Sequence, residues 1–278
     1  MAIITISREM GSGGIPIVQA AAEKLGYTLV DGDEIARVAV DYDLTLDSLA
    51  AVDEKPPAFI DKVDEKHEVS QRQVELIILE YALKGNIIVY GRGGQDLLKG
   101  VDNVFRVRIT APFEDRIERW AEREWLDPDL ARILVRKSDQ QRAGFIKYYF
   151  DRDWIDPLGY DITINTGRIS EETAIKLICE GVKDRNLLEM KEGAKKILRD
   201  RIVAKRGEIK LLSSGLLHGL HYYHFHLDVL DGVATLAGHI HSNQQRAEVH
   251  KILRTVDGIK EIIDHLEIRA YETIPQEN

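Results

Sequence analysis

The sequence predicts an α/β fold in which a parallel sheet with crossover helices precedes a second, smaller α+β domain. Over roughly the first 180 residues, short apolar runs alternate with longer helical patterns. A glycine-rich turn follows the first apolar run, and from about residue 187 the pattern changes to two alternating strands joined by Asp231-Gly232. We therefore expect two domains, covering residues 1–185 and 186–278.

The predicted strands of the first domain are short runs of apolar and β-branched residues. They cover residues 2–7, 27–31, 86–90, 104–109 and 161–165. Runs of this kind, separated by helical patterns, are typical of strands in a parallel sheet with helices between them.

The predicted helices between these strands have clear start and stop residues. They cover residues 16–25, 69–84, 113–123 and 170–184. Pro16 falls in a first turn, which tolerates its missing N–H, while Gly26 and Gly85 follow helix ends. Ser170 can cap a free amide, and the two acids after it face the positive end of the helix dipole.

The predicted second domain begins with a charged helix over residues 188–205 and continues into a hairpin. If Leu230 pairs with Val233, one face of the hairpin is polar and the other apolar. The apolar face then consists of Phe225, Leu227, Val229, Leu236, Gly238 and Ile240. Apolar residues at helical spacing over 249–256 predict an amphipathic helix, and a last strand ends at Ile268.

The composition excludes several classes of protein. The 278 residues carry a net charge of −9, so we expect no binding to nucleic acid, which needs a basic surface. A single cysteine excludes an internal disulfide framework and a cysteine-rich zinc site. No apolar run approaches the roughly 18 residues that span a bilayer, and the first residues lack the pattern of a signal peptide. These features predict a cytoplasmic protein.

The turn after the first predicted strand reads Ser7-Arg8-Glu9-Met10-Gly11-Ser12-Gly13-Gly14. Backbone amides of such a turn, at the start of a helix, can approach a phosphate closely. The common phosphate-binding pattern ends in Lys followed by Ser or Thr, where this chain has Gly14 and Ile15. The loop by itself leaves two interpretations open, a phosphate site and a tight structural turn.

Further segments, taken in order with this loop, resemble the cytidylate kinase-like family. They are Val30-Asp31-Gly32-Asp33-Glu34-Ile35, Gly91-Arg92-Gly93, residues 106–116, Asp139-Gln140-Gln141-Arg142 and residues 160–166. Members of this family share the lysine-free Gly-Ser-Gly-Gly loop, and many carry an arginine where this chain has Ile15. The resemblance covers residues 2–184 and implies a P-loop kinase fold that uses ATP with Mg²⁺ and phosphorylates a CMP-type or dCMP-type acceptor.

The same resemblance implies a role for each site residue. It implies Gly11, Ser12, Gly13 and Gly14 for the nucleotide phosphates, Asp31, Arg37 and Arg92 for the acceptor, and Arg8, Asp139 and Arg142 for catalysis. Arg116, Arg119 and Arg123 are the lid arginines, which together with Arg8 can replace the missing lysine. Phosphoryl transfer depends on positioning the reactants and on neutralising the negative charge of the transferring phosphoryl group. Arginine suits this task because its guanidinium can donate two hydrogen bonds to one phosphate.

Simpler interpretations compete with several of these roles. The lid arginines alternate with glutamates and also fit a solvated helix face. Asp31 can simply end a strand, and Asp139 can lie on the surface. Asp33 either binds magnesium or caps the following helix.

Histidines are concentrated at the C-terminal end, with eight of the nine after residue 217. The hairpin register places His224 opposite His239, with His226 and His241 nearby on the same face. Such a group can bind a divalent metal such as zinc or nickel, or titrate near pH ~6.5, and a solvated polar face is the alternative. Cys179 is expected to be an inert, buried helix residue.

The stretch from Leu227 to Ile240, the helix after it and residues 256–262 resemble a BON domain. The shared order is a strand, an Asp-Gly-Val turn, a strand, a helix, a Gly-Ile-Lys segment and a last strand. The resemblance implies a non-catalytic module that contacts phospholipid or a partner protein.

Three functions fit these predictions. The first is an enzyme that moves the γ-phosphoryl group of ATP onto a nucleoside monophosphate. The second is a nucleotide-binding sensor without catalysis, in which the BON-like module reports occupancy of the first domain. The third is an adaptor whose α/β domain is only a scaffold.

Overall fold

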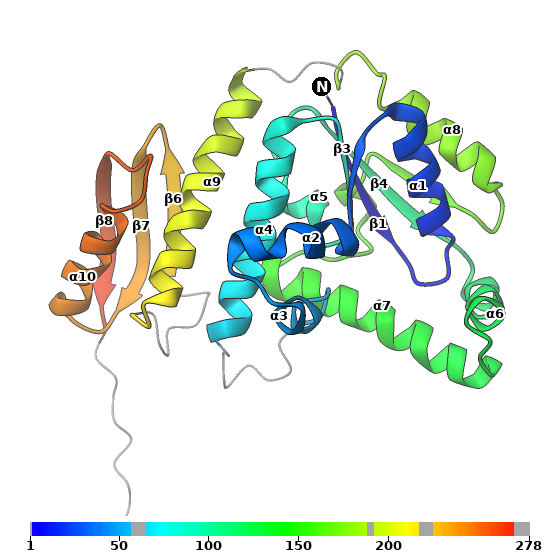
Figure 1. Ribbon diagram of the computed structural model, residues 1–278, viewed down its shortest axis with the longest axis horizontal. Helices are drawn as coiled ribbons and strands as arrows, with labels where there is room; N and C mark the ends of the chain where they lie inside the picture. The colour runs from blue at the N-terminus through cyan, green and yellow to red at the C-terminus, as the bar shows by residue number, and fades with distance from the viewer. Residues whose placement is uncertain (1, 57–64, 188–191, 217–224, 270–278) are drawn as a thin grey trace, which may run out of the picture. The chain divides into compact units, whose positions relative to one another are not determined.

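The computed structural model describes residues 2–56, 65–187, 192–216 and 225–269. It divides the chain into two compact units (Figure 1). The first unit is Met1–Ala58 with Ile77–Lys195, and the second is Phe59–Leu76 with Lys196–Asn278. The domain boundary at residues 185 and 186 stays a prediction. None of the described helices is both long enough and apolar enough to cross a membrane.

A five-stranded parallel sheet forms the centre of the first unit. The strands, in spatial order, are β2 (Thr28–Val30), β3 (Ile87–Tyr90), β1 (Ile3–Arg8), β4 (Val104–Thr110) and β5 (Ile162–Asn165). Strand β1 pairs with β3 on one side and with β4 on the other. Connections leave β1 and β3 toward opposite edges, so the carboxyl ends of these strands border the position where open α/β sheets bind ligands.

Helices cover both faces of this sheet (Figure 1). Those of the first unit are α1 (Gly14–Leu25), α2 (Gly32–Val38), η1 (Ala39–Tyr42), α3 (Leu46–Ala51), the end of α4 (Glu65–Lys84), α5 (Gly94–Leu97), α6 (Phe113–Glu124), α7 (Pro128–Phe150), η2 (Pro157–Gly159) and α8 (Glu171–Gly181). Helices α1 and α8 bury Ile17, Val18 and Ile178 against Ile4 and Val107 of the sheet. This packing fixes the turn between β1 and α1.

The second unit pairs a three-stranded sheet with helices. The strands are β6 (Phe225–Leu230), β7 (Val233–Ile240) and β8 (Glu261–Ile268), with α9 (Glu192–Ser213) and α10 (Asn243–Leu253). Strand β6 is antiparallel to β7, and β8 is parallel to it. Leu211 of α9, Leu236 of β7 and Leu253 of α10 are fully buried in one core.

The predicted fold class is confirmed, and so is the hairpin register, because Leu230 pairs with Val233. Each predicted strand lies within one or two residues of the observed one. The prediction for the charged helix was wrong at its end, because α9 continues past residue 205 to Ser213. Gly207 lies inside this helix and does not end it. Its role is close packing, because a Cβ at this position would lie only 2.7 Å from Leu227 Cδ2.

Candidate functional site

The glycine-rich turn joins β1 to α1 at the carboxyl edge of the sheet. Gly11 and Gly13 have φ of 79° and 75°, in the left-handed region that favours glycine. Among the described residues, no side chain caps α1, and Pro16 has no N–H to offer. The amides at the start of α1 therefore remain available to an anion.

The turn is held from inside by its own polar groups. The Ser12 hydroxyl is buried and donates to the Glu9 carbonyl at 2.7 Å. The Thr166 hydroxyl donates to the Ser12 carbonyl at 2.8 Å. Ser12 thus fixes the shape of the loop, and the Ser12 hydroxyl is already engaged within it.

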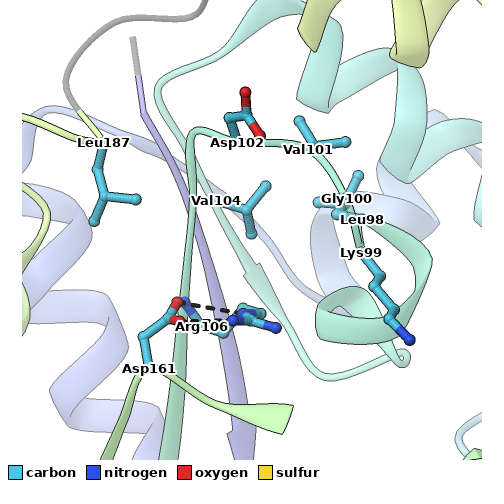
Figure 2. Close-up of a pocket in the computed structure, with 9 residues that line it drawn as sticks. All are labelled: Leu98, Lys99, Gly100, Val101, Asp102, Val104, Arg106, Asp161 and Leu187. Atoms are coloured by element: carbon cyan, nitrogen blue, oxygen red, sulfur yellow. Dashed lines mark hydrogen bonds and ion pairs between the residues drawn. The ribbon is translucent and has the colours of Figure 1, made fainter. Parts of the chain in front are cut away.

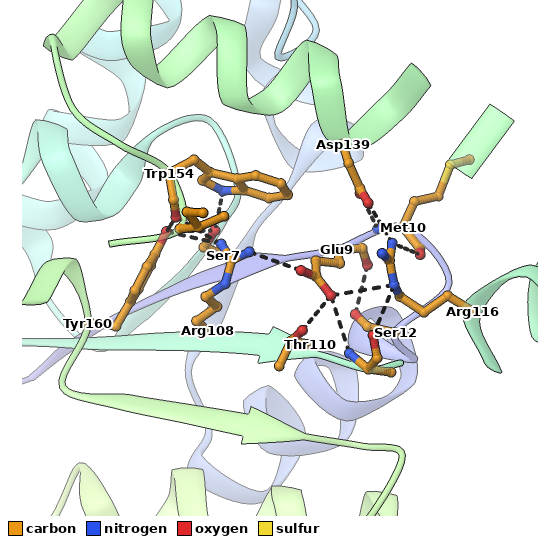
Figure 3. A network of polar contacts seen from close by, with 12 residues as sticks. Ser7, Glu9, Met10, Ser12, Arg108, Thr110, Arg116, Asp139, Trp154 and Tyr160 are labelled. Atoms are coloured by element: carbon orange, nitrogen blue, oxygen red, sulfur yellow. Dashed lines mark hydrogen bonds and ion pairs between the residues drawn. The ribbon is translucent and has the colours of Figure 1, made fainter. Parts of the chain in front are cut away.

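Glu9 lies at the centre of a polar network behind the turn (Figure 3). Its carboxylate accepts from Arg108 at 3.1 Å, lies 3.4 Å from Arg116 Nε, and accepts from the Thr110 hydroxyl. The Arg108 guanidinium lies 4.3 Å from the centre of the Trp154 ring and is almost fully buried. The Glu9 carboxylate therefore balances the positive charge of two buried arginines next to the loop.

Asp139 on α7 links the turn to the helix pair α6 and α7. It accepts from Arg116 Nη1 at 2.7 Å and from the Met10 amide at 3.3 Å (Figure 3). Arg116 also donates to the Met10 carbonyl at 3.1 Å. Asp139 and Arg116 are therefore placed where they set the position of the loop.

Arg8 at the end of β1, Arg92 in the turn after β3 and Arg142 on α7 surround one buried carboxylate, that of Glu54. Arg8 Nη1 donates to the two Glu54 oxygens at 2.7 and 2.5 Å, and Arg142 Nε donates at 3.1 Å. Arg92 donates its backbone amide to Glu54 Oε1 at 2.8 Å. Its guanidinium binds the Val52 carbonyl at 3.0 Å and the Asp53 carboxylate at 3.1 Å. The sequence separations of these contacts from Glu54 are 46, 88 and 38 residues.

This carboxylate is strongly stabilised in its charged form. Burial by itself would raise the pKa of Glu54, but the charges of Arg8, Arg142 and Arg92 together outweigh it and lower the pKa to about 2. The Arg8 guanidinium carbon also lies over Tyr90, 4.2 Å from the centre of its ring. The site is therefore a dry, arginine-rich position that favours an anion.

Of the predicted acceptor residues, Asp31 directly precedes α2 and Arg37 lies on it, and the side chains of both already have partners in the protein. The Asp31 side chain caps α2 by accepting from the amides of Asp33 and Glu34. Arg37 donates two hydrogen bonds to the Glu34 carboxylate, at 2.8 and 2.7 Å. Of the two alternatives for Asp33, capping is wrong, because Asp33 lies in the first turn and Asp31 is the cap, while magnesium binding by Asp33 stays a prediction.

The three lid arginines of α6 have three different environments. Arg116 is buried beside the loop, as described above. Arg119 donates to the Thr166 hydroxyl and carbonyl, both at 3.1 Å. Arg123 is exposed and pairs with Glu124 at 3.3 Å. Only Arg116 contacts the glycine-rich turn directly.

Within the described part of the chain, no three His, Cys, Asp or Glu side chains form a group that could hold a metal ion. The carboxylates beside the loop, Glu9 and Asp139, are already paired with arginines. This donor set fits Mg²⁺ only as a companion of a nucleotide, held mainly by phosphate oxygens and water.

The predicted histidine group falls partly outside the described residues, since His224 is not among them. His226 is exposed and pairs with Ala237 across the hairpin. His239 lies 3.5 Å from Glu267, and His241 Nδ1 lies 3.2 Å from the Arg269 carbonyl. A metal site formed by these histidines stays a prediction. Cys179 is buried on α8, as predicted.

A cavity of about 270 Å³ lies at the opposite, amino-terminal edge of the sheet (Figure 2). Its charged walls include Arg106 and Asp161, which pair at 2.7 Å. Lys99 and Asp102 also line the cavity, beside the apolar side chains of Leu98, Val104 and Leu187. Because the Arg106 charge is matched inside the cavity, the arginine site around Glu54 is the better candidate for a phosphate.

Glu9, Arg108 and Glu54 were not predicted as site residues. For Arg108 a signal existed, because an arginine within an otherwise apolar strand must be paired when it is buried. Glu54 lies in an irregular segment, and its sequence neighbours give no sign of its distant partners.

Comparison with known proteins identifies two regions of the chain. Residues 3–168, more than half of the chain, match the cytidylate kinase-like family. The chain belongs to the cytidylate kinase-like family. Residues 211–270 match the BON domain.

Relatives of this family member include two archaeal proteins named cytidylate kinase. The protein of Halobacterium salinarum is 27% identical over 181 residues, which cover 65% of this chain and 88% of the relative. The protein of Archaeoglobus fulgidus is 30% identical over 184 residues, covering 65% and 94%. A crystal structure of an uncharacterised protein from Eubacterium ventriosum matches with a TM-score of 0.54 at 24% identity, covering 66% of this chain and all of that one. This structural likeness concerns the fold alone.

Proposed function

We propose that the protein is a nucleoside monophosphate kinase that transfers the γ-phosphoryl group of ATP to CMP or dCMP. The observation that carries this proposal is the meeting of Arg8, Arg92 and Arg142 around one anion, beside the glycine-rich turn. Phosphoryl transfer requires positioning and charge neutralisation, with little covalent chemistry from the protein. A cluster of arginines next to free helix amides supplies both.

The residues divide the work by position. The amides at the start of α1 receive the phosphates of ATP, and Arg8 supplies the positive charge that a lysine gives in the common loop. Arg142 and Arg92 bind the acceptor phosphate, while Asp139 and Arg116 keep the loop in place. Bound Mg²⁺ would neutralise charge on the transferring phosphates.

The acceptor class rests on the relatives. The archaeal proteins named cytidylate kinase match this chain over nearly their whole length. We therefore take CMP and dCMP as the first acceptors to test. The BON module is proposed to contact phospholipid or a partner protein in the cytoplasm, with the domain boundary at residues 185 and 186.

A coupled assay of ADP release tests the activity. Full-length protein with ATP and Mg²⁺ is expected to turn over CMP or dCMP faster than UMP or AMP. Arg142→Ala and Arg92→Ala should each lower kcat/KM by about 10³-fold, because each removes a charge that contacts the phosphates.

The matched control is Arg132→Ala on the same helix as Arg142. Arg132 is exposed, forms an ion pair with Glu114 and lies 5.7 Å from the centre of the Phe113 ring, away from the arginine site, so its loss should leave kinetics unchanged. Absence of turnover with every acceptor would refute the proposed reaction, and wild-type kinetics in both site variants would refute the assignment of these residues.

A nucleotide-binding sensor is the second candidate, favoured by one observation. Ile15 stands where many members of this family carry an arginine, so a positive charge beside the loop is absent at that position. A protein that binds ATP or CMP by calorimetry but releases no ADP would be a sensor and not a kinase.

A further inference from the structure

We infer that Glu54 occupies the acceptor-phosphate position of the arginine site and yields it to a phosphate monoester when the acceptor binds. The inference rests on the proposed function, in which that acceptor is a nucleoside monophosphate. It adds that the acceptor competes with a carboxylate of the protein itself.

The contacts of Glu54 are those that a phosphate would make. Its two oxygens accept from two guanidinium groups and one main-chain amide, at distances between 2.5 and 3.1 Å. Charge-assisted bonds from arginine serve carboxylate and phosphate alike. A Cβ on Gly91 would overlap both Arg8 Nη1 and Glu54 Oε1, so the backbone itself closes one side of the site.

The arginines carry more charge than Glu54 balances. In the described structure, two carboxylates form ion pairs with Arg8, Arg92 and Arg142. One is Glu54, and the other is Asp53, whose side chain is 58% exposed and whose charge is therefore screened by water. Arg142 Nη1 is buried with no hydrogen-bond partner among the described residues. A phosphate, with close to two charges and three acceptor oxygens, matches this set better than one carboxylate does.

Glu54 can leave without disturbing the sheet or a helix. It follows α3 in a short irregular segment, and its φ of 48° lies in the left-handed region that residues other than glycine rarely adopt. Contacts of the Glu54 side chain with the arginines and the contacts of Arg92 with the Val52 carbonyl and Asp53 hold this conformation, so loss of the Glu54 contacts removes part of what holds the segment.

Protonation does not release this carboxylate at neutral pH. Although burial opposes its charge, the arginines lower the pKa of Glu54 to about 2. Glu54 therefore stays charged and leaves only in exchange for another anion.

The test compares anion binding with and without this charge in the full-length protein. Glu54→Gln keeps the size of the side chain and removes its charge. Inorganic phosphate, titrated by calorimetry at constant ionic strength, is expected to bind Glu54→Gln at least about tenfold more tightly than wild type. This factor follows if Glu54 fills the site in about nine of ten wild-type molecules, because only the remaining tenth can then bind phosphate. The affinity for CMP should rise by a similar factor in Glu54→Gln, whereas the affinity for cytidine, which has no phosphate, should not change.

Glu122→Gln, an exposed position on α6, removes the same charge elsewhere and should leave phosphate binding unchanged. Equal or weaker phosphate binding by folded Glu54→Gln would overturn the inference. If that variant does not fold, Glu54→Asp takes its place, because the shorter carboxylate cannot reach all its donors. Phosphate binding of Glu54→Asp identical to wild type would equally overturn it.

The kinase assay separates this inference from the proposed function. Tighter phosphate binding without turnover on any acceptor supports the role of Glu54 and refutes the kinase. Turnover of CMP without tighter phosphate binding supports the kinase and refutes the role of Glu54.

Discussion

Gly91 shows how closely the arginine site is assembled at the scale of single residues. It has a φ of 76°, and a side chain there would collide with Arg8 and Glu54. Gly91 is thus required for two reasons, its backbone conformation and the space it leaves. The neighbouring Arg92 also adopts a positive φ, of 56°, which aims its amide at Glu54.

Gly91→Ala is therefore expected to destabilise the first unit by at least about 2 kcal/mol, from backbone strain and overlap with buried groups. Urea unfolding followed by tryptophan fluorescence measures this, since Trp120, Trp125 and Trp154 all lie in the first unit.

Gly159→Ala is the matched control. Gly159 has no positive φ and no atom within 4 Å of an added Cβ, so its substitution should change stability by less than about 0.5 kcal/mol. Equal stability of the two variants would contradict the account of Gly91.

At the scale of elements, α4 and α9 meet through a buried ionic contact within the second unit. Arg72 is 1% exposed and pairs with Glu75 at 3.0 Å and with Glu208 at 3.0 Å. Lys205 contacts Glu75 at 2.8 Å. Burial would raise the pKa of Glu75, but Arg72 and Lys205 outweigh it and lower the pKa to about 2. Removal of one of these charges would leave its partner buried without a compensating charge.

Arg72→Met should destabilise α9 by about 3 kcal/mol, because it leaves Glu75 buried without its main partner. Hydrogen exchange of amides in residues 196–213 measures the free energy of local opening.

Lys196→Met, which breaks the exposed pair of Lys196 with Asp231, should change that free energy by less than about 1 kcal/mol. If Arg72→Met were as mild as this control, the buried contact would contribute little to the stability of α9.

At the scale of the whole molecule, the site belongs to the first unit alone. Arg8, Glu54, Arg92 and Arg142 all fall within it, as do the glycine-rich turn and its supporting network. The BON match lies in the second unit. The proposed nucleotide site and the BON match therefore lie in different units of the chain.

A nucleotide should accordingly stabilise the first unit. ATP or CMP at 100 times its dissociation constant is expected to add about 2.7 kcal/mol to the free energy of unfolding reported by tryptophan fluorescence. An unchanged midpoint with both nucleotides in urea titrations would show that the site binds neither.

The sequence by itself determined what local periodicity and turn chemistry control. Apolar runs and helix ends located the strands of both sheets, and Asp231-Gly232 set the register of the hairpin. These features extend over a few residues, so neighbours along the chain carry the information. The short helices α2 and α5 escaped prediction because four to seven residues show too little periodicity, and the 23-residue α7 was also not predicted.

The tertiary structure alone decided which charges meet. Asp31 caps a helix, whereas the sequence left it either at the end of a strand or, by the resemblance, in contact with the acceptor. Glu54 meets arginines 38 to 88 residues away, because the crossovers of the sheet bring the ends of β1 and β3 and the side of α7 to one place. Ionic contacts of this kind leave no periodic trace in the sequence, since each needs only one residue and a partner that the fold supplies.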